Sequence, residues 1–224
     1  MHAIPFVNDM VLAFPSLLLM RQVPDHAEIN PALAELLRAE RVADPTPSTS
    51  AIGGWQSARD LVTRGNPAVD ALMGHVGSAV LQLVSTDFGT EVAPEEITIQ
   101  AEAWGNIMDD GDFSMYHNHV RDDWSGVYYV DAERGHKTID RNGALELVDP
   151  RTLQPLTGPG RFRRPFRHVT VQPKDGLMVL FPSWMNHYVY PYRGSTERIS
   201  IAFNVKIGFT GHAGGSAERT HKPA

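Results

Sequence analysis

The sequence predicts a mainly β fold in which helices pack against the outside of a small β-barrel. Two observations support this prediction. The first 95 residues have apolar residues at helical spacing, whereas the chain after residue 95 is a series of short segments rich in β-forming residues. The 224 residues, 42% hydrophobic and 21% charged, suffice for one core but not for two comfortable domains. We therefore expect one domain over residues 1–207, with a helical part at 1–95 and a β core at 96–207.

The helical part contains two helix-start signals. In Asn30-Pro31 and in Asn66-Pro67, an asparagine that can cap a helix precedes a proline, which is tolerated at the first helical position. We also expect a short helix over Trp55 to Thr63. Apolar residues after the second signal form one stripe over about five turns at the 3.6-residue period: Val69, Leu72, Met73, Val76, Val80, Leu83 and Val84.

The β core is predicted from short segments that glycine and proline clusters separate. Many short strands at regular spacing are typical of a sandwich or a small barrel. The segment 208–224 is glycine-rich and polar, which predicts a disordered tail. The expected strands are 97–106, 125–130, 144–148, 167–171, 176–181, 187–191 and 197–205.

The charge and composition argue against several functions. With 20 basic and 26 acidic residues the formal charge is −6, so no electrostatic footprint for nucleic acid is expected. The longest apolar stretch, Val11 to Met20, contains Pro15 and is about half of what a membrane-spanning helix needs. We read no signal peptide and no membrane anchor, and we expect a cytoplasmic protein. The same stretch could cover an edge strand or build a homodimer.

The chain has no cysteine, so any metal must be held by His, Asp or Glu. His117 and His119 are two apart, and in an extended segment such residues point to the same face. They would present two imidazoles, which suit Fe, Zn, Cu and Ni. The alternative is a solvated loop with two unrelated histidines.

A third histidine, His187, follows a wholly apolar run from Leu177 to Phe181. Such a run is typical of a strand that is buried on both faces. A histidine placed just after it can join a site inside a barrel. For His187 taken alone, the more ordinary interpretation is a core histidine with a satisfied hydrogen bond.

The segment 197–204 alternates between polar and apolar residues. Its polar face carries Arg198 and Ser200, which could offer a bidentate guanidinium and a hydroxyl to a carboxylate inside the barrel. The alternative is that this face meets water and Arg198 is an ordinary surface charge.

Together and in this order, a His-x-His pair, a third histidine about 70 residues later and an Arg-x-Ser eleven residues after it resemble the plan of a 2-oxoglutarate oxygenase. The chain is similar, over about residues 14–205, to the bacterial 2OG-Fe(II) oxygenase family, which resembles the prolyl 4-hydroxylases. The further motifs that carry this resemblance are Gly-Trp-Gln-Ser (54–57), Ala-Trp-Gly-Asn (103–106), Ser-Gly-Val-Tyr-Tyr-Val (125–130), Phe-Pro-Ser-Trp (181–184) and Arg-Ile-Ser-Ile-Ala-Phe-Asn (198–204).

The resemblance implies a double-stranded β-helix, also called a jelly roll or cupin-like barrel, with Fe(II) and the cosubstrate 2-oxoglutarate. By position, His117 and His187 match iron ligands. Arg198 matches the arginine that pairs with the cosubstrate, and Ser200 matches its hydroxyl companion. Tyr129 matches a tyrosine that hydrogen-bonds the cosubstrate. Asn106 is implied as a further cosubstrate contact, and Asn106 and Trp104 are implied to line the pocket. No catalytic side chain is implied beyond the metal centre.

One position departs from the wider superfamily, which has His-x-Asp or His-x-Glu where this chain has His119. We expect His119 to complete the metal site, and Asp123 is the alternative carboxylate ligand. Three neutral imidazoles would leave the site more positive, which favours an anionic oxo-acid and also suits Zn²⁺ or Ni²⁺.

Three functions follow from these patterns. The leading one is an Fe(II)/2-oxoglutarate-dependent dioxygenase of the hydroxylase type. The second is a three-histidine, cupin-like dioxygenase that does not use 2-oxoglutarate. The third is a metal-loaded barrel that binds without turnover, with the basic cluster Arg161–Arg167 as a contact surface. The substrate is left open among peptides and small molecules, and the loops at 107–116 and 131–143 are expected to select it.

Overall fold

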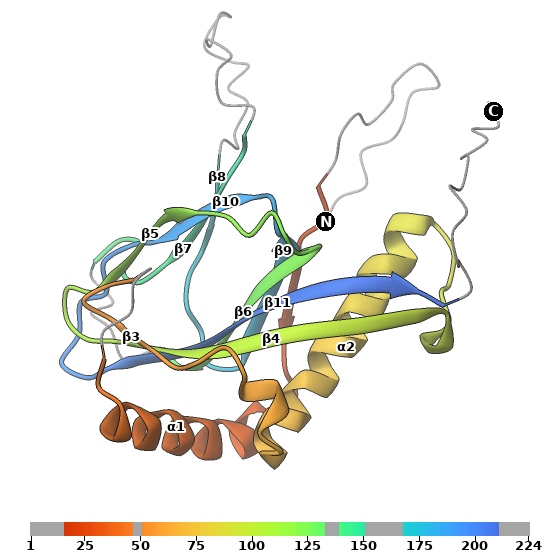
Figure 1. The fold of residues 1–224 in the computed structure, drawn as a ribbon. Helices are drawn as coiled ribbons and strands as arrows, with labels where there is room; N and C mark the ends of the chain where they lie inside the picture. Colours follow the sequence, from red (N-terminus) through yellow and green to blue (C-terminus); the bar gives the residue numbers. More distant parts are fainter. Residues whose placement is uncertain (1–15, 47–50, 133–138, 151–167, 211–224) are drawn as a thin grey trace, which may run out of the picture.

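Two antiparallel sheets face each other in the computed structural model, which describes residues 16–46, 51–132, 139–150 and 168–210 (Figure 1). The larger sheet has the order β1-β9-β6-β11-β4-β3 and the smaller one β2-β5-β10-β7-β8. The strands of the larger sheet are β1 (Leu19–Gln22), β3 (Trp55–Gln56), β4 (Ile97–Met108), β6 (Trp124–Asp131), β9 (Leu177–Pro182) and β11 (Arg198–Phe209). Those of the smaller sheet are β2 (Ala51–Ile52), β5 (Phe113–His117), β7 (Leu145–Val148), β8 (His168–Val171) and β10 (Asn186–Val189).

Two helices, α1 (His26–Ala43) and α2 (Pro67–Phe88), cover the larger sheet on the side away from the smaller one (Figure 1). Two 3-10 turns, Leu61–Thr63 and Pro94–Glu96, complete the described elements. This arrangement confirms the predicted fold, which is mainly β with flanking helices.

The alternation along β11 separates two layers of the molecule. Ile199, Ile201 and Phe203 pack against the helices in the larger apolar core. Their neighbours Arg198, Ser200, Ala202 and Asn204 point between the sheets, where they line a cavity. Because side chains alternate between the two faces of a strand, the polar face predicted from the sequence is the inner face of the barrel.

Helix α2 begins where the sequence predicted. The Asn66 side chain accepts hydrogen bonds from the amides of Ala68 and Val69 at 3.0 and 3.3 Å, and Pro67 occupies the first helical position. The predicted apolar stripe is buried, apart from the half-buried Met73. By length and composition alone α2 could cross a membrane, but a helix whose apolar stripe lies in the core needs no such explanation.

Helix α1 begins one turn earlier than predicted, at His26, so Asn30 is not its cap. Asn30 instead joins the helix to β6: its Nδ2 donates to the Val130 carbonyl at 2.7 Å, and its Oδ1 accepts from the Tyr128 hydroxyl at 2.5 Å. Ile29 and Leu33, on either side of Pro31, both pack in the core. This packing is consistent with a helix that begins before the proline, at His26.

The predicted helix over Trp55 to Thr63 is wrong. Trp55 and Gln56 form β3, which pairs with Ile107 and Asn106 of β4, and only Leu61–Thr63 is helical, as a 3-10 turn. Pairing with β4 satisfies the backbone here through residues about fifty positions away, which a local pattern cannot reveal.

Both ends of the domain differ in detail from expectation. The end of the apolar stretch at 11–20 forms part of β1, which covers β9 as an edge strand. Strand β11 runs to Phe209, two residues into the predicted tail. Residues 211–224 and the basic cluster Arg161–Arg167 lie outside the described residues.

Candidate metal centre and pocket

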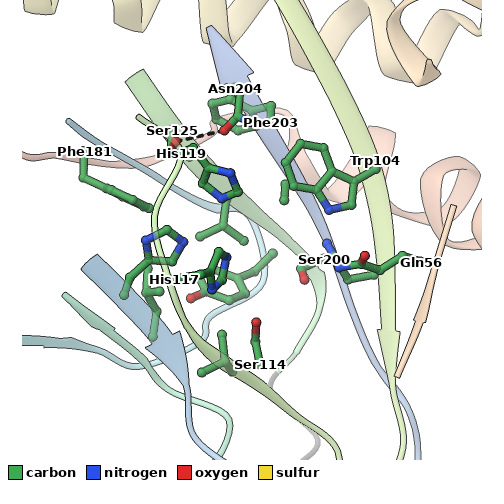
Figure 2. Close-up of a pocket in the computed structure, with 18 of the residues that line it drawn as sticks. Gln56, Trp104, Ser114, His117, His119, Ser125, Phe181, Ser200, Phe203 and Asn204 are labelled. Carbon is green, nitrogen blue, oxygen red and sulfur yellow. Dashed lines mark hydrogen bonds between the residues drawn. The ribbon is translucent and has the colours of Figure 1, made fainter. Parts of the chain in front are cut away.

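Three histidines lie together between the sheets: His117, His119 and His187. Figure 2 labels the first two of them. One ring nitrogen of each lies within 4.8 Å of the others. His117 and His187 are directly paired across β5 and β10, and their ring centroids are 4.3 Å apart. Among the described residues, no other group of three His, Asp or Glu side chains has this proximity.

Two of the histidines have one ring nitrogen engaged by the backbone. The Nδ1 of His117 lies 2.6 Å from the Met115 carbonyl, and the Nδ1 of His187 lies 2.9 Å from the Met185 carbonyl. Since a carbonyl only accepts, Nδ1 carries the proton in both rings and Nε2 keeps a free lone pair. This is the tautomer in which a second partner orients a metal-binding histidine.

The environment favours neutral imidazoles. Burial, aided by the nearby His117, lowers the pKa of His187 from 6.5 to about 3. Burial also lowers the pKa of His119 to about 4, with smaller contributions from His117 and Arg59. Neutral imidazole is the form that binds a metal ion, so these rings are prepared as ligands at neutral pH.

His119 reaches the group in a way that differs from the prediction. Strand β5 ends at His117, so His119 does not share a strand face with it. The His119 amide donates to the Ser183 carbonyl at 2.9 Å, which holds the turn against the end of β9. The Asn118 side chain donates to Asn186 of β10 at 2.8 Å, so both sides of the turn are anchored.

The alternative ligand, Asp123, is occupied elsewhere. Its Oδ2 accepts a hydrogen bond from the Ile207 amide at 2.7 Å, and it does not line the cavity. The geometry therefore groups His119, and not Asp123, with the other two histidines.

A cavity of about 260 Å³ opens from the histidines into the barrel (Figure 2). It is lined from the inner faces of both sheets, and apart from the alternative ligand Asp123 it includes each residue that the sequence suggested for the site. These residues are Trp104, Asn106, His117, His119, Tyr129, His187, Arg198 and Ser200.

Arg198 lies at one end of the cavity with only 2% of its surface exposed. Its Nη1 donates to Ser200 Oγ at 3.2 Å, and its guanidinium carbon lies 5.1 Å from the centre of the Tyr129 ring. Burial lowers the pKa of Arg198, but a guanidinium keeps its charge in proteins.

No acidic side chain among the described residues lies within ion-pair distance of Arg198. Arg198 Nε and the buried Tyr129 hydroxyl also lack a hydrogen-bond partner in the described part of the chain. A buried charge without a partner is costly, so this end of the cavity is suited to an anion with several acceptor oxygens.

Among the residues of the cavity wall that the sequence analysis did not assign to the site are Gln56 and Arg59. Gln56 Nε2 donates to Asn106 Oδ1 at 2.8 Å, and Arg59 stacks over the ring of Trp104. Both follow from the pairing of β3 with β4, and the only signal for them in the sequence was the Gly-Trp-Gln-Ser motif.

Comparisons with known proteins agree with this geometry. Residues 102–204, which contain the three histidines and Arg198, match the family model described as "Putative 2OG-Fe(II) oxygenase". A search of curated proteins found no match.

Several solved structures share the fold. A Pseudomonas putida prolyl-4-hydroxylase has 18% identity and a TM-score of 0.57, over 84% of this chain and 91% of that one. A Trichoplax adhaerens prolyl hydroxylase, in complex with a peptide fragment of the hypoxia inducible factor oxygen degradation domain, has 17% identity and a TM-score of 0.56, over 84% and 83%. The epimerase SnoN, in complex with Fe³⁺, α-ketoglutarate and nogalamycin RO, has 15% identity and a TM-score of 0.54, over 92% and 88%.

The solved structures confirm the predicted fold, and the family model matches the predicted resemblance over residues 102–204. The two facing antiparallel sheets are the double-stranded β-helix of these oxygenases. The family match covers the strands that supply the histidines and the buried arginine.

Proposed function

We propose that this chain is a 2OG-Fe(II) oxygenase, which uses Fe(II) and 2-oxoglutarate to hydroxylate a substrate that is not yet identified. One observation supports this proposal above the others. A three-histidine cluster and a buried arginine without an acidic partner among the described residues lie in the same cavity, which also leaves room for a ligand between them.

The histidines fit a divalent iron ion. His117, His119 and His187 would hold it, because one ring nitrogen of each lies within 4.8 Å of the others and two of the rings have a fixed tautomer. When bound, the iron with its cosubstrate would activate O₂ for substrate oxidation. The chain itself supplies the ligand geometry and a cavity between the two sheets.

The buried end of the cavity fits the far carboxylate of 2-oxoglutarate. Arg198 would form a charge-assisted pair with it, and the Ser200 and Tyr129 hydroxyls would contribute further hydrogen bonds. Asn106 lies next to Ser200 on the paired strand, and its amide group, oriented by Gln56, would line the same ligand. These groups bind and orient the cosubstrate but transfer no proton.

The location and the substrate remain part of the proposal. We infer a cytoplasmic reaction on a small molecule or a peptide, and the relatives with bound ligands show that this fold accepts both kinds. A homodimer stays a prediction.

An anaerobic titration of the Fe(II)-loaded protein with 2-oxoglutarate tests the proposal. We expect a weak visible metal-to-ligand charge-transfer band in the wild-type protein. Arg198→Gln should bind iron normally and weaken 2-oxoglutarate binding by about tenfold or more, since a charge-assisted hydrogen bond contributes roughly 1.5–3 kcal/mol. His187→Ala should lose iron.

Arg193→Gln is a matched control, because Arg193 is an exposed arginine whose partner is Asp110 and which lies outside the cavity wall. It should behave like the wild type. If iron binds and no band forms in the wild-type protein, the assignment of 2-oxoglutarate to this cavity is wrong.

The three-histidine set also supports a second candidate, a dioxygenase that binds its substrate directly to iron without 2-oxoglutarate. Neutral imidazoles without a carboxylate ligand are the feature that favours it. Oxygen consumption that depends on a substrate but not on 2-oxoglutarate would select this function. Zinc bound in preference to iron, with no succinate formed, would instead point to a binding barrel without turnover.

A further inference from the structure

The proposed reaction leaves one arginine of the cavity wall without a role, Arg59. Its guanidinium carbon lies 4.3 Å from the centre of the Trp104 ring, and its Nη1 donates to Glu102 Oε1 at 2.9 Å. The Trp104 ring in turn meets the ring of His119, with the centroids 6.0 Å apart (Figure 2). Trp104 therefore lies between Arg59 and a candidate metal ligand.

The backbone holds the segment that carries Arg59. The Ser57 amide donates to the Gly105 carbonyl at 3.0 Å, and the Gly105 amide donates back to Ser57 Oγ at 2.8 Å. On the other side of Arg59, Asp60 forms a parallel bridge with Ala103. These two anchors fix the Arg59 backbone beside β4, and its half-exposed side chain borders the cavity.

The charged side chains that line the cavity are all positive among the described residues. Among the described residues that line it are two arginines, Arg59 and Arg198, and no aspartate or glutamate. Glu102 lies outside the lining, and its Oε1 is shared between Arg59 and the Asn204 side chain, which donates to it at 2.9 Å. Arg59 has five N–H donors, so most of them are available to a ligand or to water.

The two arginines belong to different levels of the barrel. Arg59 lies over the ring of Trp104, which is opposite Ala202, whereas Arg198 lies opposite Met108, four residues along each strand. At about 3.3 Å per residue, these two rows of the backbone are roughly 13 Å apart. Since the proposed function assigns the far carboxylate of the cosubstrate to Arg198, an anion at Arg59 would be a second one.

We propose that Arg59 binds a carboxylate of the substrate, so that the substrate is a small carboxylic acid held with its acid group on the Trp104 side of the cavity. This inference rests on the proposed function, because that function assigns Arg198 to the cosubstrate. Arg59 is then a specificity-determining residue: the stack on Trp104 orients its guanidinium, and Glu102 keeps it extended.

Calorimetric titration with a matched pair of probes tests this inference. The probes are N-benzoylglycine and its primary amide, added anaerobically to the Fe(II)-loaded protein with saturating 2-oxoglutarate. The wild-type protein should bind the acid on the order of tenfold more tightly than the amide, because only the acid forms a charge-assisted pair. In Arg59→Gln the preference should vanish while the charge-transfer band remains.

Two further variants sharpen the test. Glu102→Gln keeps the hydrogen bonds but removes the competing negative charge, so its preference for the acid should rise. Arg64→Gln is the control, since Arg64 is also paired with acidic groups, Asp60 and Glu40, but lies outside the cavity wall. It should keep the wild-type preference.

The outcomes separate this inference from the function on which it rests. If the band forms but the wild-type protein binds acid and amide equally, or if Arg59→Gln keeps the preference, Arg59 is only a structural ion pair and the inference is wrong. If no band forms, the proposed function fails, and the acid preference is then measured in the metal-free protein, where its absence overturns the inference too.

Discussion

Gly143 lies against the Arg198 side chain, so a larger residue at position 143 would displace that side chain. It has a backbone φ of +59°, and a Cβ added there would lie 3.2 Å from Arg198 Cδ, 3.3 Å from its Nε and 3.3 Å from a ring carbon of Tyr192. In Gly143→Ala, the left-handed backbone should reduce the free energy of unfolding by about 1 kcal/mol. The contacts are tighter than ordinary van der Waals separations, so Arg198 must move by a few tenths of an ångström toward the cavity.

That movement should be visible in cosubstrate binding. Since the guanidinium is stacked on Tyr129 and bonded to Ser200, a small displacement misaligns all its donors at once. We expect Gly143→Ala to weaken 2-oxoglutarate binding by about three- to thirtyfold, a part of the roughly 1.5–3 kcal/mol that a charge-assisted hydrogen bond contributes. Iron affinity should stay unchanged. The assay is the anaerobic charge-transfer titration, with chemical denaturation for stability.

Gly65 offers a matched control. Its φ is +65°, and a Cβ added there would meet nothing within 4 Å. Gly65→Ala should therefore have a similar cost in stability and no effect on 2-oxoglutarate. Equal cosubstrate affinities in the two variants would refute the reasoning that Gly143 acts through Arg198.

Three further predictions concern stability. Because the pKa values of His187 and His119 fall to about 3 and about 4 in the folded state, the unfolded state binds more protons below pH 6.5, and the metal-free protein should lose stability as pH falls from 6.5 to 4. The slope of the free energy of unfolding against pH approaches about 1.4 kcal/mol per pH unit for each histidine. This slope should be smaller in His187→Gln, as measured by urea unfolding at several pH values. Asn66→Ala should lower the free energy of unfolding by about 1 kcal/mol, because the cap of α2 is lost, and an unchanged urea midpoint would contradict this role. Gly126→Ala should cost about 1–3 kcal/mol by thermal unfolding, because its Cβ would collide with the Phe203 ring and lie 2.7 Å from the Val179 carbonyl oxygen.

The parts of the site that the sequence predicted depend on short-range signals. Arg198 and Ser200 could be placed on one face because alternation along a strand fixes which side chains share it. His187 could be placed because an apolar run identifies the buried strand β9, and the chain can travel only a few residues before it enters β10. In such cases the local pattern and the tertiary structure agree.

The parts that the sequence did not predict depend on contacts between distant segments. Asn30 has the character of a helix cap, but its side chain is used by Tyr128 and Val130, about a hundred residues away. Arg59 enters the cavity wall because Ser57 bonds to Gly105, forty-eight residues along the chain. His119 was expected from a strand, although a turn that is held by Ser183 supplies it. No local periodicity encodes these partners.

The charge of the cavity has a consequence for how its ligands bind. The three imidazoles contribute no negative charge, and Arg59 and Arg198 contribute two positive ones, so a dication would enter an already positive space. The dianion 2-oxoglutarate offsets that charge, and each ligand should therefore strengthen the binding of the other by the same factor. We expect the dissociation constant of Fe(II), or of Zn(II) as a redox-inert substitute, to fall at least about fivefold when 2-oxoglutarate is present, measured by competition with a metallochromic chelator. The same factor should appear in the 2-oxoglutarate affinity when metal is added.

Arg198→Gln should lower the cosubstrate affinity with and without metal. It should leave much of the coupling factor intact, because the direct attraction between the dianion and the metal remains. A metal affinity that is indifferent to 2-oxoglutarate would mean that the two do not share this cavity.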